Sequence, residues 1–487
     1  MPNSALLEQI LEADGSAPGR TPGSAGPQSL TYSLDEAIDW VGFGRLQLQL
    51  GVLLGLSWLS ESMEVMLLSL LSPALLCDWR ISPWRQATVS TAVFVGMTCG
   101  QLYWGRFADR HGRKPTMLVS GFFLAYFGFL SSFAPTFIWI TILRCLVGFF
   151  IGSVQQVVTL FTEFLPTNQR GKSLIIIQLF WTSGAILEVL LAMVVVPTLG
   201  WRWLLATSSI PLVLFALLSP LLVESPRYHA ACGRPELAQA TMDLLAAKNG
   251  RALPPGHLET SSANDESRGH FPDLLSRQNR RTSVLLWTLW MMVTFCYYGI
   301  IMLATELLKM PEDQMCSAID EPQQERVCQA HCTTLTKADY LDVLWTALSE
   351  LPGLLLTVLL VDKIGRKKTI AGGLLIFILS LSVPLFCIHS RMLLTASLGV
   401  GRAAIASVFL GLTIYTPEVY PTHLRATGNG TCGAFGRIGA ITTPLIAQVL
   451  IHSSVRHTAA VYASSAALGI AATLLLPYET AGRAMVR

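Results

Sequence analysis

The sequence has few charged residues for its length, and this scarcity argues against a soluble globular protein. Of 487 residues, 13% are Asp, Glu, Lys or Arg and 52% are hydrophobic, whereas soluble domains contain about 25% charged residues. The net charge of +3 is too small to indicate nucleic-acid binding. Long apolar runs recur instead, and a helix of about 20 apolar residues is enough to cross a bilayer.

Several motifs are also missing, and each absence removes a class of function. No cysteine pair has the Cys-x-x-Cys spacing of a metal site, and no phosphate-binding loop of an ATP-driven pump occurs. The sequence contains no Ser/His/Asp or metal-ligand constellation, so we expect neither an enzyme nor a cofactor. Residues 1–30 lack the apolar core of a cleavable signal peptide, so the first membrane helix is expected to direct insertion.

The apolar runs predict an all-α membrane protein with twelve transmembrane helices, six in each half. The expected helices cover residues 46–71, 84–105, 115–133, 136–162, 173–196, 202–222, 283–308, 339–361, 369–389, 391–416, 429–451 and 456–477. This pattern divides the chain into a tail (1–45), a six-helix bundle (46–223), a linker (224–282), a second bundle (283–477) and a short tail (478–487). Within the first tail, Ser33 is a candidate cap for an amphipathic helix.

The Lys and Arg residues predict the orientation, because positive residues near helix ends stay on the cytoplasmic side. They cluster at 106–114, 277–281 and 363–368, which are loops on one side of the predicted bundle. Both tails and the linker are therefore expected to be cytosolic. The loop at 309–338 balances its basic residues with acids and is expected to face the lumen or the exterior.

Charged motifs occur twice, which indicates an internal duplication. The stretch 109–114 (Asp-Arg-His-Gly-Arg-Lys) returns at 362–367 as Asp-Lys-Ile-Gly-Arg-Lys, and Glu-x-x-Pro-Thr-x-x-Arg at 163–170 returns at 418–425. Glu224 and Glu479 stand at matching places after the last apolar run of each half. Three repeats in register predict two pseudo-symmetric halves.

These motifs resemble those of the sugar-porter and organic-ion branch of the major facilitator superfamily. The resemblance rests on 105–114, Arg144-x-x-x-Gly148, 163–170 and 224–227, and it covers nearly the whole chain. More narrowly, the segments 35–45, 200–203, 297–299 and 415–421 are similar to those of the synaptic vesicle two-related proteins. The resemblance implies the major facilitator fold, and it favours a synaptic or secretory vesicle membrane, with the plasma membrane as the alternative.

In this family, charges at cytosolic helix ends form gates that break when that side opens. The resemblance assigns this role in the first half to Asp109, Arg110, Gly112, Arg113, Glu163, Arg170 and Glu224. It assigns the same role in the second half to Asp362, Gly365, Arg366, Glu418, Arg425 and Glu479. The alternative is that the basic residues serve only to orient the protein, which would not explain the acids at fixed spacing.

Ionisable residues within apolar runs are candidates for solute binding and proton coupling, because each is costly in a bilayer. Glu61 and Glu64 share one face of the first helix, and either is at a suitable depth to meet Arg144. The resemblance implies that such a pair couples transport to protons; a purely structural ion pair is the alternative. Further candidates for the cavity lining are Glu188, Glu306, Glu350, Arg402, Arg437, Trp181, Tyr297 and Tyr298.

The leading hypothesis is a secondary active transporter of a small polar or charged organic solute, with protons as the coupling ion. The alternative is a transporter-like vesicle protein that binds or regulates a partner and carries little flux. The oligomeric state is left open. Cys77, Cys316, Cys328 and Cys332 share the non-cytosolic side, where an oxidising compartment would allow two disulfides.

Overall fold

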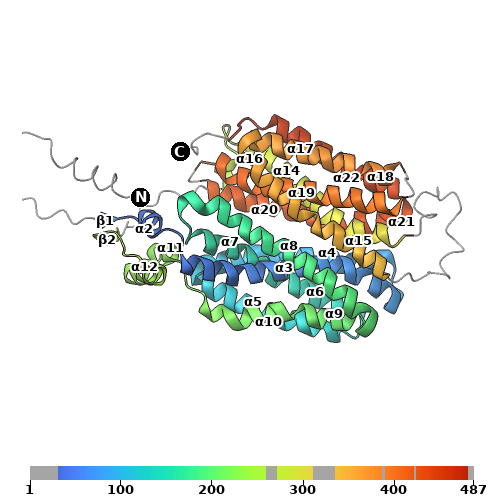
Figure 1. The fold of residues 1–487 in the computed structure, drawn as a ribbon, viewed down its shortest axis with the longest axis horizontal. Coiled ribbons are helices and arrows are strands. Elements are labelled where there is room, and N and C mark those ends of the chain that lie inside the picture. Colours follow the sequence, from blue (N-terminus) through green and yellow to red (C-terminus); the bar gives the residue numbers. More distant parts are fainter. Residues whose placement is uncertain (1–30, 259–270, 311–334, 387–389, 422–423, 481–487) are drawn as a thin grey trace, which may run out of the picture.

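The computed structural model describes residues 31–258, 271–310, 335–386, 390–421 and 424–480. Nearly all of them are helical, and the helices run side by side along the long axis of the molecule (Figure 1). We call the end where α3 begins at Arg45 and α22 ends at Leu475 the proximal end. The opposite end, where α3 ends at Trp79, is the distal end.

The first half of the chain crosses the bundle six times. Its helices are α3 (Arg45–Trp79), α4 (Pro83–His111), α5 (Arg113–Leu130) with η1 (Ser131–Phe133), α6 (Phe137–Ile151) with η2 (Gly152–Val154) and α7 (Gln155–Thr162), α8 (Arg170–Leu199), which follows η3 (Thr167–Gln169), and α9 (Trp201–Ser208) with α10 (Ile210–Leu218) and η4 (Ser219–Leu221). In Figure 1 this half, blue to green, lies below the second half.

The second half repeats the six crossings. Its helices are α14 (Arg280–Leu308), α15 (Lys337–Leu348) with α16 (Glu350–Ile364), α17 (Arg366–Ser380) with α18 (Ser382–Leu385), α19 (Arg391–Val419), α20 (Arg425–Leu445) with the π-turn η6 (Ile446–Leu450) and α21 (Ile451–Ser453), and α22 (Val455–Leu475). Twelve crossings in two halves confirm the predicted fold.

One of the twelve crossings, α4, is too polar to be recognised as a membrane span by hydropathy. Within the described residues, the other eleven have both the length and the hydropathy of a spanning segment. α4 has 29 residues and is about 43 Å long at 1.5 Å per residue. Because α4 packs against α6 and, across the interface, against α20, its Gln86 and Gln101 side chains bind protein groups instead of facing lipid.

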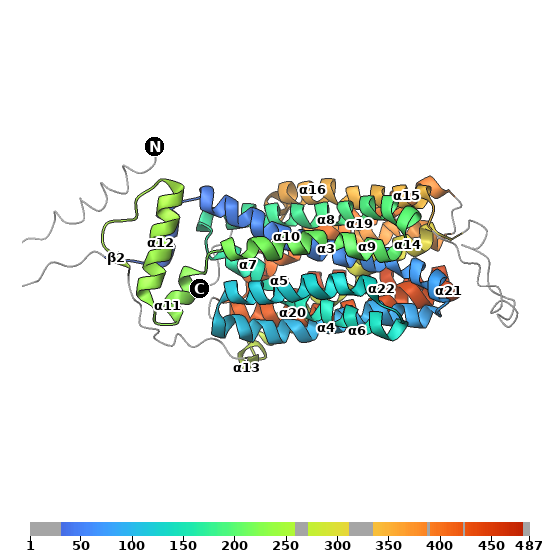
Figure 2. The ribbon, with the colours of Figure 1, turned by 90° about the horizontal axis from the view of Figure 1, so that it is seen from below.

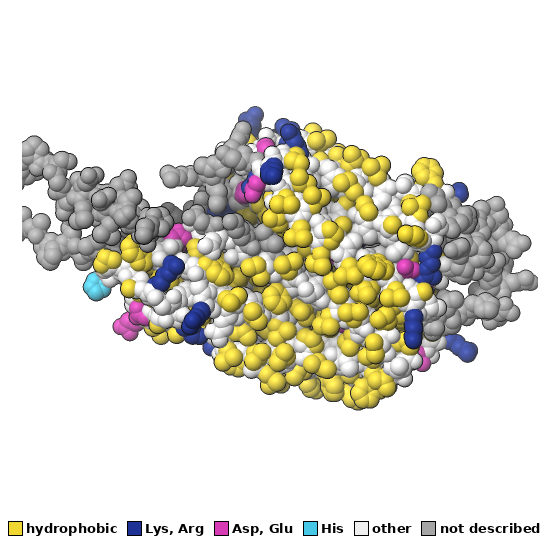
Figure 3. All heavy atoms as spheres, viewed as in Figure 1, with side chains coloured by type: hydrophobic (Ala, Val, Ile, Leu, Met, Phe, Trp, Pro, Cys, Tyr) yellow, Lys and Arg dark blue, Asp and Glu magenta, His cyan; other side chains and the backbone are white. Residues whose placement is uncertain are grey.

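The surface of the bundle matches a bilayer. Hydrophobic side chains cover the middle of the face seen in Figure 3, while Lys and Arg side chains lie near the two ends. Large apolar residues such as Phe122, Leu217 and Leu359 are at least 60% exposed, which is stable only against lipid. The protein is therefore a multi-pass membrane protein.

A small cap covers part of the proximal end (Figure 2). It consists of α2 (Leu34–Val41), α11 (Pro226–Ala231), α12 (Pro235–Asn249) and the two-residue strands β1 (Thr31–Tyr32) and β2 (His257–Leu258), which pair in parallel. Ser33 caps α2 through a capping box with Glu36, as the sequence predicts. Asp39 of α2 accepts hydrogen bonds from the backbone and hydroxyl of Thr167 at 2.7 and 2.8 Å. Asp35 of α2 forms an ion pair with Arg227 of α11, so α2 connects the linker with the first half.

Glycines set the distance between α4 and α6. A Cβ atom at Gly100 would lie 1.9 Å from the Phe149 carbonyl oxygen, and one at Gly148 would lie 2.1 Å from the Val93 carbonyl oxygen. Such contacts between backbones are the usual way in which membrane helices pack closely.

We expect Gly100→Ala to lower the melting temperature of the purified protein, because the added methyl group would force α4 and α6 apart; overpacking typically costs about 1–3 kcal/mol. Gly105→Ala on the same helix is the matched control, since nothing lies within 4 Å of its added Cβ. Thermal unfolding in detergent measures both variants. Equal melting temperatures for the two variants would contradict the packing argument.

Candidate functional site

The interior of the bundle holds the side chains that the sequence predicts to line a central site. Each of them is at most 7% exposed: Glu61, Glu64, Arg144, Trp181, Glu188, Tyr297, Tyr298, Glu306, Glu350, Arg402 and Arg437. A charged group at mid-depth in a bilayer costs about 3 kcal/mol on insertion scales. The partners of each buried side chain therefore determine whether it is available to bind a solute or a proton.

An ion pair joins α3 and α6 inside the first half. Arg144 Nη1 lies 2.7 Å from Glu64 Oε2, and both side chains are buried. Arg144 also donates to Ser131 Oγ at 3.3 Å and to the Gly128 carbonyl at 3.4 Å. Of the two acids that the sequence offers to this arginine, the structure pairs Glu64 with it, while Glu61 faces the second half.

A third carboxylate, Glu188, lies beside this ion pair and forms no ion pair of its own in the described part of the chain. Glu188 Oε1 accepts a hydrogen bond from the Ser208 hydroxyl at 2.8 Å, and Oε2 has no hydrogen-bond partner in the described part of the chain. Glu188 is close enough to interact electrostatically with both Glu64 and Arg144. Arg144 therefore has two carboxylates, those of Glu64 and Glu188, within its electrostatic range.

A second buried ion pair joins α16 and α19. Arg402 Nε lies 2.6 Å from Glu350 Oε1. Both side chains also contact the first half, because Thr182 Oγ1 donates to Glu350 Oε2 at 3.2 Å and Arg402 Nη1 lies 3.9 Å from Met66 Sδ. This ion pair is shared between the halves, unlike the one between α3 and α6.

Aromatic rings cross the interface beside the second ion pair. Trp181 Nε1 donates to the Tyr297 hydroxyl at 2.6 Å, and the Trp181 ring lies 5.6 Å from that of Trp58. Tyr298 packs against Phe94 of α4, with ring centroids 5.0 Å apart. These rings provide faces and edges against which a flat or cationic solute can pack.

Glu61 and Arg437 come from opposite halves and are close enough to interact electrostatically, although no direct ion pair joins them. Arg437 Nε donates to Gln101 Oε1 of the first half at 3.3 Å, and its guanidinium is also within electrostatic range of the Tyr298 hydroxyl. Arg437 therefore lies in the interior between the halves and belongs to the central site.

Several polar atoms in this interior have no hydrogen-bond partner among the described residues. They include Trp58 Nε1, Glu61 Oε2, Thr294 Oγ1 and Arg402 Nη2. An unpaired buried donor or acceptor costs about 1–3 kcal/mol, so a bound polar group that pairs with these atoms gains free energy. Trp58 and Thr294 carry no charge and are not among the predicted site residues, although each lies one helical turn from one of them.

Two hydrogen bonds close the distal end between the halves. Gln86 Nε2 of α4 donates to Glu306 Oε1 of α14 at 2.8 Å, and Gln448 Nε2 donates to Ser72 Oγ at 3.0 Å. Glu306 also pairs with Lys309 at 2.5 Å. Glu306 therefore belongs to this distal closure. Gln86, Ser72 and Gln448 belong to no motif, so they could not be predicted as part of this closure.

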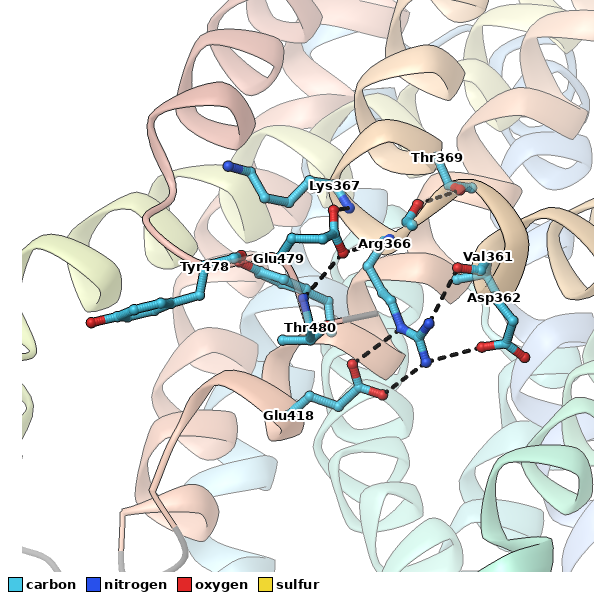
Figure 4. A network of polar contacts seen from close by, with 11 residues as sticks. Val361, Asp362, Arg366, Lys367, Thr369, Glu418, Tyr478, Glu479 and Thr480 are labelled. Carbon is cyan, nitrogen blue, oxygen red and sulfur yellow. Dashed lines mark hydrogen bonds and ion pairs between the residues drawn. The ribbon is translucent and has the colours of Figure 1, made fainter. Parts of the chain in front are cut away.

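At the proximal end, a network of polar contacts joins four segments of the second half (Figure 4). Arg366 Nε and Nη2 donate to the Glu418 carboxylate at 3.2 and 3.4 Å, and Nη2 lies 3.0 Å from Asp362 Oδ1. Glu479 accepts hydrogen bonds from the backbone N–H groups of Arg366 and Lys367 at 2.9 and 3.1 Å. A carboxylate from the end of the chain thus caps the N-terminus of α17, where the helix dipole favours negative charge.

The first half has the same arrangement. Glu224 accepts from the backbone N–H groups of Arg113 and Lys114, both at 3.0 Å, and so caps α5. The Arg113 guanidinium lies 3.4 Å from Glu163 and 3.8 Å from Asp109. Burial raises the pKa of the Glu163 carboxyl, and the positive charge of Arg113 offsets part of this rise.

Glycine is required at the turn before each capped helix. Gly112 and Gly365 have φ angles of 100° and 105°, which other residues rarely adopt. A Cβ atom at Gly112 would lie 2.3 Å from Glu224 Oε2, and one at Gly365 would lie 3.1 Å from Glu479 Oε2. The absent side chain therefore leaves the space that each capping carboxylate occupies.

The other predicted gate residues differ in their placement. Arg110 is exposed and takes part through its carbonyl, which accepts from the Tyr228 hydroxyl at 2.9 Å. Arg425 Nε is buried and has no hydrogen-bond partner among the described residues. The side chain of Arg170, its counterpart in the repeat, lies outside the described residues.

Of the four cysteines predicted to form disulfides, Cys77 is disulfide-bonded. Cys316, Cys328 and Cys332 lie outside the described residues. No group of three or more His, Cys, Asp or Glu side chains suited to a metal ion occurs among the residues searched, which are the described ones.

Two family models match the chain. The family model described as "Sugar (and other) transporter" matches residues 60–310, and the model of the "Major Facilitator Superfamily" matches residues 336–484. The chain is 44% identical to the synaptic vesicle 2-related protein of Rattus norvegicus over 480 residues, covering 98% of this chain and 86% of the relative. It is 35% identical to SVOPL of Homo sapiens over 479 residues, covering 95% of both chains.

Among solved structures, the xylose transporter XylE from E. coli, in a partially occluded inward open conformation, has the same fold. The TM-score is 0.66 at 18% identity, and the match covers 90% of this chain and 99% of that chain. Fold, motifs and relatives agree that this protein is a transporter and not an enzyme. The chain belongs to the major facilitator superfamily, and within it to the family of the synaptic vesicle 2-related proteins.

Proposed function

We propose that the protein is a proton-coupled secondary transporter that moves a small polar or charged organic solute by alternating access. The observation that carries this proposal is the polar interior shared by the two halves, in which buried donors and acceptors lack partners. Contacts close this interior at the distal end, and charge networks lie at the proximal end. A site between two halves is the usual position for a solute in this fold.

The chemistry of the interior supports an organic solute with both a hydrogen-bond donor and an acceptor. Glu61 Oε2 offers an acceptor, while Trp58 Nε1 and Arg402 Nη2 offer donors. The rings of Trp181 and Tyr297 supply packing surface beside them. A small number of polar groups within an aromatic lining is typical of small-molecule sites.

The Glu64–Arg144 ion pair, with Glu188 beside it, supports proton coupling. Protonation of Glu64 would remove the charge that holds Arg144, and Glu188 would become its partner. The exchange of partners takes place inside the first half, where it can change the packing of α3 against the second half. Release of the proton would restore the first arrangement.

The two bundles, 46–223 and 283–477, are proposed to move as units around the central site, with 224–282 as the linker between them. The basic residues at the proximal end support a cytosolic location for this end and for both termini. The similarity to the rat synaptic vesicle 2-related protein supports a synaptic vesicle as the membrane in which this protein resides.

The transport proposal predicts gradient-driven uptake that depends on Glu64. In proteoliposomes, we expect the wild-type protein to accumulate at least one member of a panel of organic cations, organic anions, sugars and vitamins when a pH gradient is imposed. Glu64→Gln is expected to abolish this accumulation and to leave solute exchange without a gradient intact, because the neutral side chain mimics the protonated state. Uptake of labelled solute, with and without the gradient, measures both activities.

The matched control is Glu236→Gln, which changes an exposed carboxylate on α12 and is expected to keep gradient-driven uptake. If Glu64→Gln accumulates solute as well as the wild type does, the coupling role of the ion pair is wrong. If no solute moves faster than in empty liposomes, the binding or regulatory function becomes the better explanation.

The two proximal networks predict local effects that can be measured independently of the solute. Glu479→Gln removes the charge that caps α17, so the amides of Arg366 and Lys367 are expected to exchange hydrogen about tenfold faster, since a charge-assisted hydrogen bond contributes about 1.5–3 kcal/mol. Glu224→Gln should do the same at α5 and leave α17 unchanged. Hydrogen-exchange mass spectrometry of both variants measures these rates, and each half serves as the control for the other. If either variant exchanged faster at both α5 and α17, the two networks would not be separate.

The distal closure predicts a shift in conformation. Gln86→Leu removes the hydrogen bond to Glu306 between the halves, so the distal end is expected to open more often. Spin labels at Arg85→Cys and Arg456→Cys, in a background without the native free cysteines, would report the distance between the halves at this end. Thr88→Val, an exposed change on the same helix, is the control; identical distance distributions for Gln86→Leu and the control would reject the proposed closure.

A further inference from the structure

A groove lies at the proximal end between the start of α14 and the end of α22. Its volume is about 450 Å³, and it is lined by Leu275, Arg280, Arg281, Val284, Leu285 and Leu475. α13 (Phe271–Leu274) ends directly before Leu275, and its Phe271 ring stacks on Trp287 of α14 at 5.9 Å. The groove therefore lies where the membrane-spanning helices meet the linker.

The apolar wall of the groove is exposed in a way that suits lipid. Leu275, Val284 and Leu475 are 45%, 49% and 54% exposed. Val284 lies one turn inside α14, and Leu475 is the last residue of α22. This wall is thus continuous with the apolar surface that faces the bilayer.

The polar wall carries two arginines, and no acid forms an ion pair with them among the described residues. Arg281 Nη2 donates to the Leu475 carbonyl at 3.0 Å, which fixes its guanidinium at the rim. No ion pair or hydrogen bond of the Arg280 side chain occurs among the described residues, and the first turn of α14 contains no acid. In the described segment before α14, residues 271–279, the charged side chains are those of Asp273 and Arg277, and both are exposed.

We propose that this groove binds an anionic phospholipid of the proximal leaflet. The headgroup phosphate would lie on Arg280 and Arg281, where the N-terminus of α14 adds to the positive potential. An acyl chain would run along Val284, Leu285 and Leu475. Basic pockets between membrane helices at the cytosolic boundary are suited to such headgroups. Basic residues that serve only to orient the protein need neither a hollow nor an apolar wall.

Bound lipid would tie the start of α14 to the end of α22, two helices of the second half. Native mass spectrometry tests this inference on the full-length protein in mild detergent, with added phosphatidylserine or phosphatidylcholine. The wild-type protein is expected to retain phosphatidylserine preferentially. The double variant Arg280→Gln/Arg281→Gln should bind it roughly 30-fold more weakly, because each juxtamembrane arginine contributes to attraction of anionic lipid.

Three further variants keep the test decisive. Arg280→Gln alone disturbs no contact of the described chain and should still weaken binding, while Arg280→Lys/Arg281→Lys should retain most of it. Arg85→Gln/Arg456→Gln removes the same charge at the distal end and should have no effect. The proposal would be overturned if the wild-type protein retained both lipids equally, or if Arg280→Gln/Arg281→Gln bound phosphatidylserine as well as the wild type does. It would also be overturned if inorganic phosphate displaced bound phosphatidylserine as effectively as added phosphatidylserine does. The readout does not involve transport, so it stands or falls independently of the proposed function.

Discussion

A charge inside a membrane must have a partner, and most of this structure follows from that constraint. Transferring a charged side chain to the middle of a bilayer costs about 3 kcal/mol even on insertion scales. Arg144 and Arg402 therefore each bind a glutamate within 2.7 Å, and the helices that supply these residues cannot slide independently. The same rule applies to Glu188, which lies within electrostatic range of Arg144, although its second oxygen has no hydrogen-bond partner among the described residues.

At the proximal end the same constraint applies to backbone groups. The first N–H groups of a helix have no partner within the helix, and in α5 and α17 a glutamate from the end of the same half supplies it. A glycine before each helix leaves room for that carboxylate, so the residues of each repeated motif depend on one another. The spacing of the motif therefore reflects one local structure: a glycine turn, the start of a helix and a glutamate from the end of the same half that caps it. Each half contains this structure once, and so each half contains the motif once.

The sequence predicted the features that follow from spacing and hydropathy. It gave the twelve crossings, the duplicated networks, the buried acids and arginines, and the cap of α2 by Ser33. It left open whether Glu61 or Glu64 binds Arg144, because two residues three positions apart share a helix face and only the packing of α6 separates them. Gly299 belongs to a family motif, but a Cβ atom there would lie 2.2 Å from the Tyr462 ring, and α14 is continuous at this position, so close helix packing accounts for the glycine. Gln86, Ser72 and Gln448 were missed because contacts between neutral residues of separate halves leave no pattern along the chain.

The two ends of the molecule differ in what their polar contacts connect. Each proximal network joins segments of one half, whereas the distal hydrogen bonds Gln86–Glu306 and Ser72–Gln448 join the two halves. The proximal networks therefore make each half rigid, and the distal bonds contribute to the balance between conformations. Two such bonds are worth about 2–4 kcal/mol together, while reversing a two-state equilibrium from 1:99 to 99:1 takes about 5.5 kcal/mol. In the proposed transport cycle, the remaining free energy would have to come from solute binding and from the change of partner at Arg144.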